Sequence, residues 1–183
     1  MNGEAIEALV INSHDRSCGY QFLLGVYRFI CSNGLITGDT FESFKVRHVG
    51  WSSEEIVGAS RKIVEAAPVL SERIQDFKTI TLTPDEQGVF ASAAHQVIYD
   101  EPEKAPVRPA ALLTARRHDS DRETLWTTYN NIQENMMKGG LPGFTRNGRR
   151  TTTRKVKSID KNAKLNKALW TLTEKMAELK KAA

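Results

Sequence analysis

The helical spacing of apolar residues after residue 52 constrains this fold more than any other feature of the sequence. A first apolar stripe runs from Ile56 to Phe77 at three- and four-residue steps, which is typical of one face of a helix. Ser52 and Glu55 have the spacing of a capping box at its start. Pro68 lies within the stripe and predicts a kink or two abutting helices, because proline lacks the amide hydrogen that a helix interior uses.

Three further helices are predicted from their start and stop signals. The stretch 83–86, Thr-Pro-Asp-Glu, combines a cap, a proline at the first helical position and a glutamate three residues after the cap, so a helix should run to about Tyr99. A second capping box, at 120–123, predicts a helix that ends at the two glycines 139–140. The apolar stripe from Leu165 to Leu179 predicts an amphipathic C-terminal helix.

The first 50 residues contain the expected β structure. Residues 5–12 are dense enough in apolar side chains for a buried strand, and 35–49 alternate as strands do, with a turn at 38–39. Residues 20–32 have apolar side chains at three- and four-residue steps and predict a buried helix, which the Asn-Gly pair at 33–34 would end.

These elements predict an α+β fold, a small and mainly antiparallel sheet packed by four to five helices. We expect a single domain with a sheet-and-helix core over 1–100 and a helical part over 110–183, which carries a basic arm. The Pro-rich segment 100–109 between them predicts a linker and the seam of the fold, and a short helix should follow over 109–115.

Positive charge is concentrated at one end of the chain. From Lys138 to the C-terminus there are 13 Lys and Arg against 3 acidic residues, whereas the rest of the chain carries 13 basic and 19 acidic residues. This asymmetry favours a polyanionic partner, of which nucleic acid is the most common, although a solvated tail has the same composition.

The densest basic segment is 146–157, in which six of twelve residues are Arg or Lys and none is acidic. Arg and Lys neutralise phosphates and release counterions, and threonine hydroxyls such as those at 151–153 donate to phosphate oxygens. A β-hairpin or loop with solvated charges is the alternative interpretation. The segment predicts a nucleic-acid track made of Arg146, Arg149, Arg150, Arg154, Lys155 and Lys157.

Other residues could extend this track. Lys45 and Arg47 share one face of an expected strand, although such pairs are more often only the solvated side of a sheet. Phe144, beside the basic segment, is the candidate for stacking on a nucleic-acid base, and Trp51 could lie at a rim. The tryptophans at 126 and 170 lie in amphipathic stripes and are expected in the core.

No convincing catalytic constellation or cofactor motif occurs in the sequence. His14, Asp15 and Cys18 are too few for a zinc site, and the Gly-Gly-Leu-Pro-Gly stretch at 139–143 does not match a phosphate-binding loop. We therefore expect no enzyme activity, no metal and no cofactor. No run approaches a membrane span, and two cysteines outside any CxxC motif favour a reduced, cytoplasmic protein without a membrane partner.

Four stretches together resemble one family: LGVYRFICSNGLITGD, FKVRHVG, LWTTYNNIQENMMKGG and TTTRKVKSIDKNAKLNKALWTLTEKM. The chain is identified through them, over about residues 6–177, as a member of domain-of-unknown-function family 932, which phages and plasmids encode. Its members usually have a longer N-terminal part before the segment matching ALVINSHD. A missing strand would expose a sheet edge that invites pairing with another chain.

The fold-level resemblance to phage single-strand annealing proteins is more distant. It implies single-stranded DNA binding without ATP or metal, in recombination or maintenance of a phage or plasmid, and a homo-oligomer such as a ring. A different class of function stays open, namely an anti-CRISPR or anti-restriction protein that binds a bacterial defence complex. An annealing protein should bind single-stranded DNA and form a large oligomer, whereas an inhibitor should be small and bind naked DNA poorly.

Overall fold

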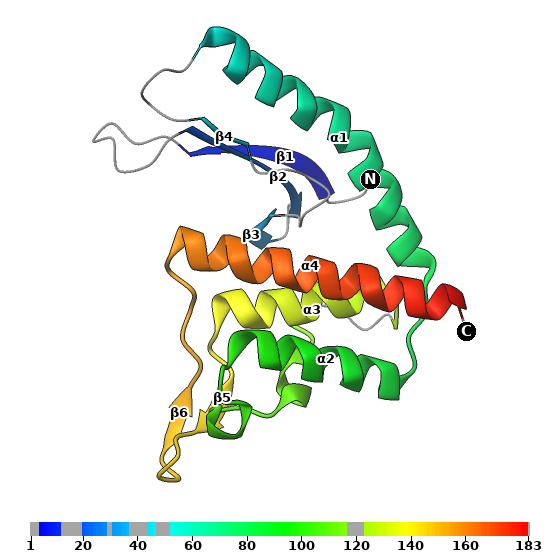
Figure 1. Ribbon diagram of the computed structural model, residues 1–183. Helices are drawn as coiled ribbons and strands as arrows, with labels where there is room; N and C mark the ends of the chain where they lie inside the picture. Colours follow the sequence, from blue (N-terminus) through cyan, green and yellow to red (C-terminus); the bar gives the residue numbers. More distant parts are fainter. Residues whose placement is uncertain are drawn as a thin grey trace. The chain divides into compact units, whose positions relative to one another are not determined.

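The structure is a computed structural model that describes residues 4–11, 20–28, 31–36, 44–46, 52–116 and 123–182 (Figure 1). The chain divides into two compact units, Met1–Arg73 and Ile74–Ala183. In the described residues, the first contains an antiparallel sheet and most of a long helix, and the second contains the end of that helix, three further α-helices, two 3-10 helices and a short hairpin. The fold is therefore α+β, as the sequence predicts.

The sheet of the first unit is built around its second strand. β1 (Glu4–Ile11) pairs antiparallel with β2 (Tyr20–Arg28) along almost its whole length. β3 (Cys31–Ile36) and β4 (Phe44–Val46) pair with different parts of β2, at residues 25–28 and 20–22. Because β1 occupies one edge of β2, the two short strands share its other edge.

The prediction of a helix over 20–32 is wrong. Residues 20–28 form the central strand β2, and the Asn-Gly pair at 33–34 lies inside β3 rather than at a helix end. Residues 22–27 form a short apolar run, and such a run cannot be separated from a buried helix by its spacing alone.

Helix α1 (Ser53–Thr79) begins where the sequence predicts. The backbone amide of Ser52 donates to the Glu55 carboxylate, and the amide of Glu55 donates to the Ser52 hydroxyl, which is the reciprocal pattern of a capping box. The helix continues through Pro68 as one element of 27 residues, so the alternative of two abutting helices is wrong.

Helix α2 (Pro84–Ile98) confirms the strongest local signal of the sequence. The Thr83 side chain accepts from the Glu86 amide, the Glu86 carboxylate accepts from the Thr83 amide, and Tyr99 caps the other end. The Pro-rich segment that follows contains the 3-10 helix η1 (Pro102–Lys104) and leads to the 3-10 helix η2 (Pro109–Leu113). This segment lies inside the second unit, which begins at Ile74.

Helix α3 (Leu125–Lys138) starts later than expected. Its cap is Thr124, whose side chain accepts from the amide of Thr127, so the prediction that the capping box at 120–123 opens this helix is wrong. Ser120 itself lies outside the described residues. Gly139 and Gly140 end the helix as predicted, with φ values of 61° and 78° that favour glycine.

The basic arm forms a two-stranded hairpin, β5 (Pro142–Phe144) and β6 (Arg150–Thr152), and α4 (Ile159–Ala182) follows it. Helices α2, α3 and α4 pack against one another, and the hairpin lies at one end of this bundle (Figure 1). No helix in the described part of the chain is long and apolar enough to cross a membrane.

Aromatic rings fill the centre of the bundle. The Tyr129 ring stacks on Trp126 and meets Trp170 edge-on, with ring centroids 5.4 and 5.9 Å apart, and Phe77 packs on Trp170. Both tryptophans are buried, as predicted. Leu179 is the exception in the last apolar stripe, because its side chain is 67% exposed near the end of α4.

Candidate nucleic-acid interface

The six cations of the predicted track are all exposed. We call them the basic track; they are Arg146, Arg149, Arg150, Arg154, Lys155 and Lys157. Within the described residues, none of the six makes an ion pair with a carboxylate. By contrast, Lys138 and Lys180 at other sites of the same unit are paired with Glu134 and Glu86. The charges of the basic track are therefore not neutralised by the described part of the protein.

The first strand of the hairpin is fastened to the Pro-rich segment. The amide of Phe144 donates to the carbonyl of Pro106 over 2.8 Å. The backbones approach so closely that a Cβ atom on Gly143 would lie 2.0 Å from the same carbonyl oxygen, so only glycine fits there. The Pro106 side of this contact is held in turn, because Val107 is buried and its carbonyl accepts from the His95 ring.

The segment after the hairpin is fastened to the end of α3. The amides of Gly140 and Thr153 donate to the carbonyls of Thr153 and Leu141, and the Thr153 hydroxyl accepts from the Leu141 amide. Gly139 contacts the backbone of Arg154 so closely that a Cβ atom would lie 2.5 Å from its carbonyl carbon. These contacts fix the backbone from which the Arg154 side chain extends.

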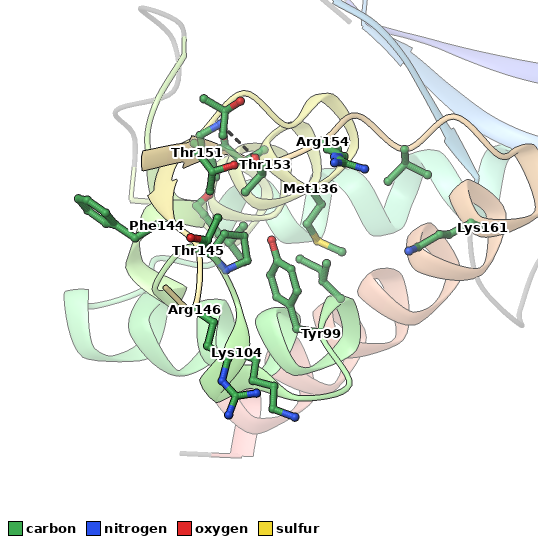
Figure 2. A pocket seen from close by; sticks show the side chains of 17 residues that line it. Tyr99, Lys104, Met136, Phe144, Thr145, Arg146, Thr151, Thr153, Arg154 and Lys161 are labelled. Carbon is green, nitrogen blue, oxygen red and sulfur yellow. Dashed lines mark hydrogen bonds between the residues drawn. The ribbon is translucent and has the colours of Figure 1, made fainter. Parts of the chain in front are cut away.

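A cavity of about 500 Å³ lies between the hairpin, the Pro-rich segment and the ends of the helices (Figure 2). Its apolar wall consists of Ile98, Pro106, Leu112, Met136, Leu141 and Val156. Four cations also line it, namely Lys104, Arg146, Arg154 and Lys161, and of these Lys104 forms an ion pair with Glu101. None of the lining residues is acidic. An apolar interior whose charged lining residues are all basic suits a ligand that is both flat or apolar and negatively charged.

The uncharged polar side chains that line this cavity are Asn135, Tyr99 and the threonines at 145 and 151–153. Asn135 and Tyr99 differ in what they can still bind. Asn135 donates both amide hydrogens to the carbonyls of Leu112 and Thr114 and accepts from Arg116, so both of its side-chain donors are used. Tyr99 is half-buried, and this burial raises the pKa of its hydroxyl. Its ring packs on His95 at 4.7 Å and its side chain points into the cavity (Figure 2).

The structure brings together only part of the predicted site. Arg146, Arg154 and Phe144 line the cavity. Phe144 is 59% exposed, and its ring points outward from the cavity in Figure 2. The other four residues of the basic track are exposed but do not line the cavity. Lys45 lies in β4 of the other unit, and Arg47 lies outside the described residues.

Sequence reasoning missed three residues of this site, which are Tyr99, Lys104 and Lys161. Tyr99 lies at the end of α2, Lys104 lies in the Pro-rich segment, and Lys161 lies at the start of α4. The one signal in the sequence is an aromatic residue at a helix end, followed by a segment that contains a lysine. This pattern is too common to identify a binding site. The other candidates Trp51, His14, Asp15 and Cys18 lie outside the described residues. In the described part of the chain, no cluster of His, Cys, Asp or Glu could hold a metal ion.

Comparison with known proteins identifies the family of this chain. Residues 2–170 match the family described as "Domain of unknown function (DUF932)", and the chain belongs to this family. Two curated relatives are UPF0380 protein YfjQ and UPF0380 protein YafZ, both from Escherichia coli (strain K12). Each is 36% identical to this chain over 168 residues, which is 92% of the chain and 61% of the relative. The chain thus spans less than two thirds of their length. No solved structure matches the chain.

Proposed function

We propose that this protein binds single-stranded DNA along the basic track, with little sequence preference. The observation that carries the proposal is six exposed cations on one hairpin and the segment after it, without a carboxylate partner in the described residues. Cations that were buried, or paired with carboxylates of the protein, would not be available to bind the phosphates of a polyanionic ligand. Phosphates that replace their counterions would supply the binding free energy.

A single strand fits this surface better than a duplex. The hairpin presents an exposed aromatic ring, Phe144, together with threonine hydroxyls beside the cations. Unpaired bases stack on aromatic rings whatever their sequence, whereas the bases of a duplex are already stacked on each other. The proposed role is DNA binding or annealing in the recombination or maintenance of a phage or plasmid, in line with the resemblance to annealing proteins.

The salt dependence of binding tests this proposal. If all six cations neutralise phosphates, the logarithm of the association constant falls with the logarithm of salt with a slope of about −4, because each contact on a single strand contributes about −0.7. Affinity for a thymidine oligonucleotide should then fall about 300-fold between 50 and 200 mM salt. Fluorescence anisotropy at several salt concentrations measures the slope.

The decisive variant changes Arg149, Arg150, Arg154, Lys155 and Lys157 to Gln. Its slope should be shallower by about 3.5. A control variant changes Arg108 and Lys164, which are exposed in the same unit but lie outside the basic track and the cavity, to Gln. The control should keep the wild-type slope. The proposal would be refuted if the wild type and the variant with five substitutions bound with equal affinity and equal salt slope.

A further inference from the structure

We infer that the cavity beside the hairpin holds one internal base of the bound strand, with a phosphate on each side of it. This inference rests on the proposed function, because it assigns the strand a fixed point on the surface. The observations that carry it are the apolar wall, the inward-pointing Tyr99 ring and the four cations that line the same cavity. None of them depends on the four basic-track cations outside the lining.

The volume and wall of the cavity suit an extruded base. About 500 Å³ lies within the range of small-ligand sites, and such sites are mostly apolar with a few polar groups that fix orientation. A base that leaves the solvent would contact Met136, Leu141 and the Tyr99 ring, all of which line the cavity. The Tyr99 ring is held in place by its packing on His95, so little rotational freedom is lost on binding.

The cations favour a nucleotide inside a strand over a free nucleotide. Figure 2 shows Lys104 and Arg146 toward one side of Tyr99, and Arg154 and Lys161 toward the other. An internal nucleotide has a phosphate on both its 5′ and 3′ sides, whereas a nucleoside monophosphate has one phosphate only. Lys104 is paired with Glu101, so Arg146 on one side and Arg154 and Lys161 on the other carry this match to the charge pattern of a continuous strand.

The same cavity is poorly equipped to choose among bases. Discrimination requires fixed donors and acceptors that a base edge can pair with, and both amide donors of Asn135 are already used on Leu112 and Thr114. The hydroxyls of Tyr99 and of the lining threonines can each donate or accept, so they do not favour one base edge over another. The Thr153 hydroxyl already accepts from the Leu141 amide. The inferred pocket therefore accepts any base by stacking and burial, which is the behaviour that an annealing protein needs.

The test compares two oligonucleotides of about 20 residues, one of thymidine and one in which every base is replaced by an abasic sugar. Both carry the same phosphates, so the basic track contributes equally to each. Wild-type protein should bind the abasic strand at least about 5-fold more weakly, the smallest loss expected when stacking on one aromatic ring is removed. Tyr99→Ala should weaken binding of the thymidine strand by about 5- to 150-fold, the range for one ring, and leave binding of the abasic strand unchanged.

Matched variants separate the pocket from its surroundings. Lys161→Gln should weaken binding of the thymidine strand, whereas Lys164→Gln, an exposed lysine on the same helix outside the cavity, should not. Tyr99→Phe keeps the ring and should retain the wild-type affinity. Two measurements do not depend on whether Tyr99→Ala folds. They are the affinity of Tyr99→Phe and the binding of the abasic strand to wild-type protein.

The outcomes distinguish the two proposals. Salt-dependent binding that is equal for the thymidine and abasic strands would overturn the base pocket and leave the proposed function standing. The base pocket would also be overturned if thymidine monophosphate competed as well as the oligonucleotide on a per-site basis. A nucleotide with one phosphate would then bind the cavity as tightly as an internal nucleotide with two. Absence of binding to either strand would overturn the proposed function and the pocket together.

Discussion

Gly143→Ala is the substitution whose consequence follows most directly from the contacts of the hairpin. The added Cβ would lie 2.0 Å from the carbonyl oxygen of Pro106, 2.8 Å from its carbonyl carbon and 2.9 Å from Val107 Cγ1. Ordinary contact begins at 3.4 Å, so the two backbones must separate by about 1.4 Å. Such a shift breaks the 2.8 Å hydrogen bond from the Phe144 amide to Pro106.

The expected cost is about 2–4 kcal/mol. Overpacking at a closely packed contact costs about 1–3 kcal/mol, and a lost hydrogen bond costs about 1 kcal/mol. If the hairpin detaches before the bundle unfolds, the cost appears instead as local opening of the hairpin. Trypsin would then cleave the chain after the arginines of the hairpin. The cavity would also lose Phe144 and Arg146 from its lining.

Two measurements follow this change. Chemical denaturation, monitored by fluorescence of the buried tryptophans Trp126 and Trp170, gives the free energy of unfolding of the second unit. Limited trypsin digestion reports cleavage after Arg149 or Arg150. The control is Gly88→Ala in α2, where a Cβ atom meets nothing within 4 Å and a gain of about 0.5–1 kcal/mol is expected. Unfolding and cleavage of Gly143→Ala that match the wild type would refute the inferred contact.

Three further changes test the bundle. Thr83→Ala should lower the free energy of unfolding by about 1 kcal/mol in denaturant titrations, because α2 loses its cap. Hydrogen bonding from the Thr83 backbone, followed by Lys180, holds the pKa of the Glu86 carboxyl below its usual 4.5. A lowered folded-state pKa stabilises the fold fully above about pH 4.5 and less as pH falls through the folded value, so Glu86→Gln should flatten the acid limb of a stability–pH curve. The buried Tyr129 hydroxyl has no hydrogen-bond partner in the described residues, so Tyr129→Phe should leave thermal stability unchanged or slightly raised, and a large loss would contradict this.

The helical part of the fold could be predicted because its signals are local. A cap and the glutamate three residues later satisfy the free amides of the same helix, as Thr83 and Glu86 do in α2. The two glycines after α3 likewise adopt positive φ values that other residues rarely adopt. Such signals depend on neighbours within one turn, so they are present in the sequence before any tertiary contact forms.

The central strand could not be predicted for the opposite reason. The apolar run of β2 fits a helix as well as a strand, and its identity depends on pairing with β1, β3 and β4. The cap of α3 was misplaced for a related reason. Thr81 and Thr124 form a bridge, and backbone hydrogen bonds join Leu82 to Glu123 and Leu125 to Ile80, so a contact distant in sequence holds the start of this helix.

The sequence alone determined that cations are concentrated at 146–157, because charge is a property of composition and chain order. Only the tertiary structure decided which cations share a cavity, since Lys104 and Lys161 come from segments more than 40 residues apart on either side of the hairpin. Their approach depends on the Gly143 contact with Pro106 and the Gly139 contact with Arg154, two places where backbones meet without an intervening side chain. Distances of that kind arise from packing and leave no periodic signal in the sequence.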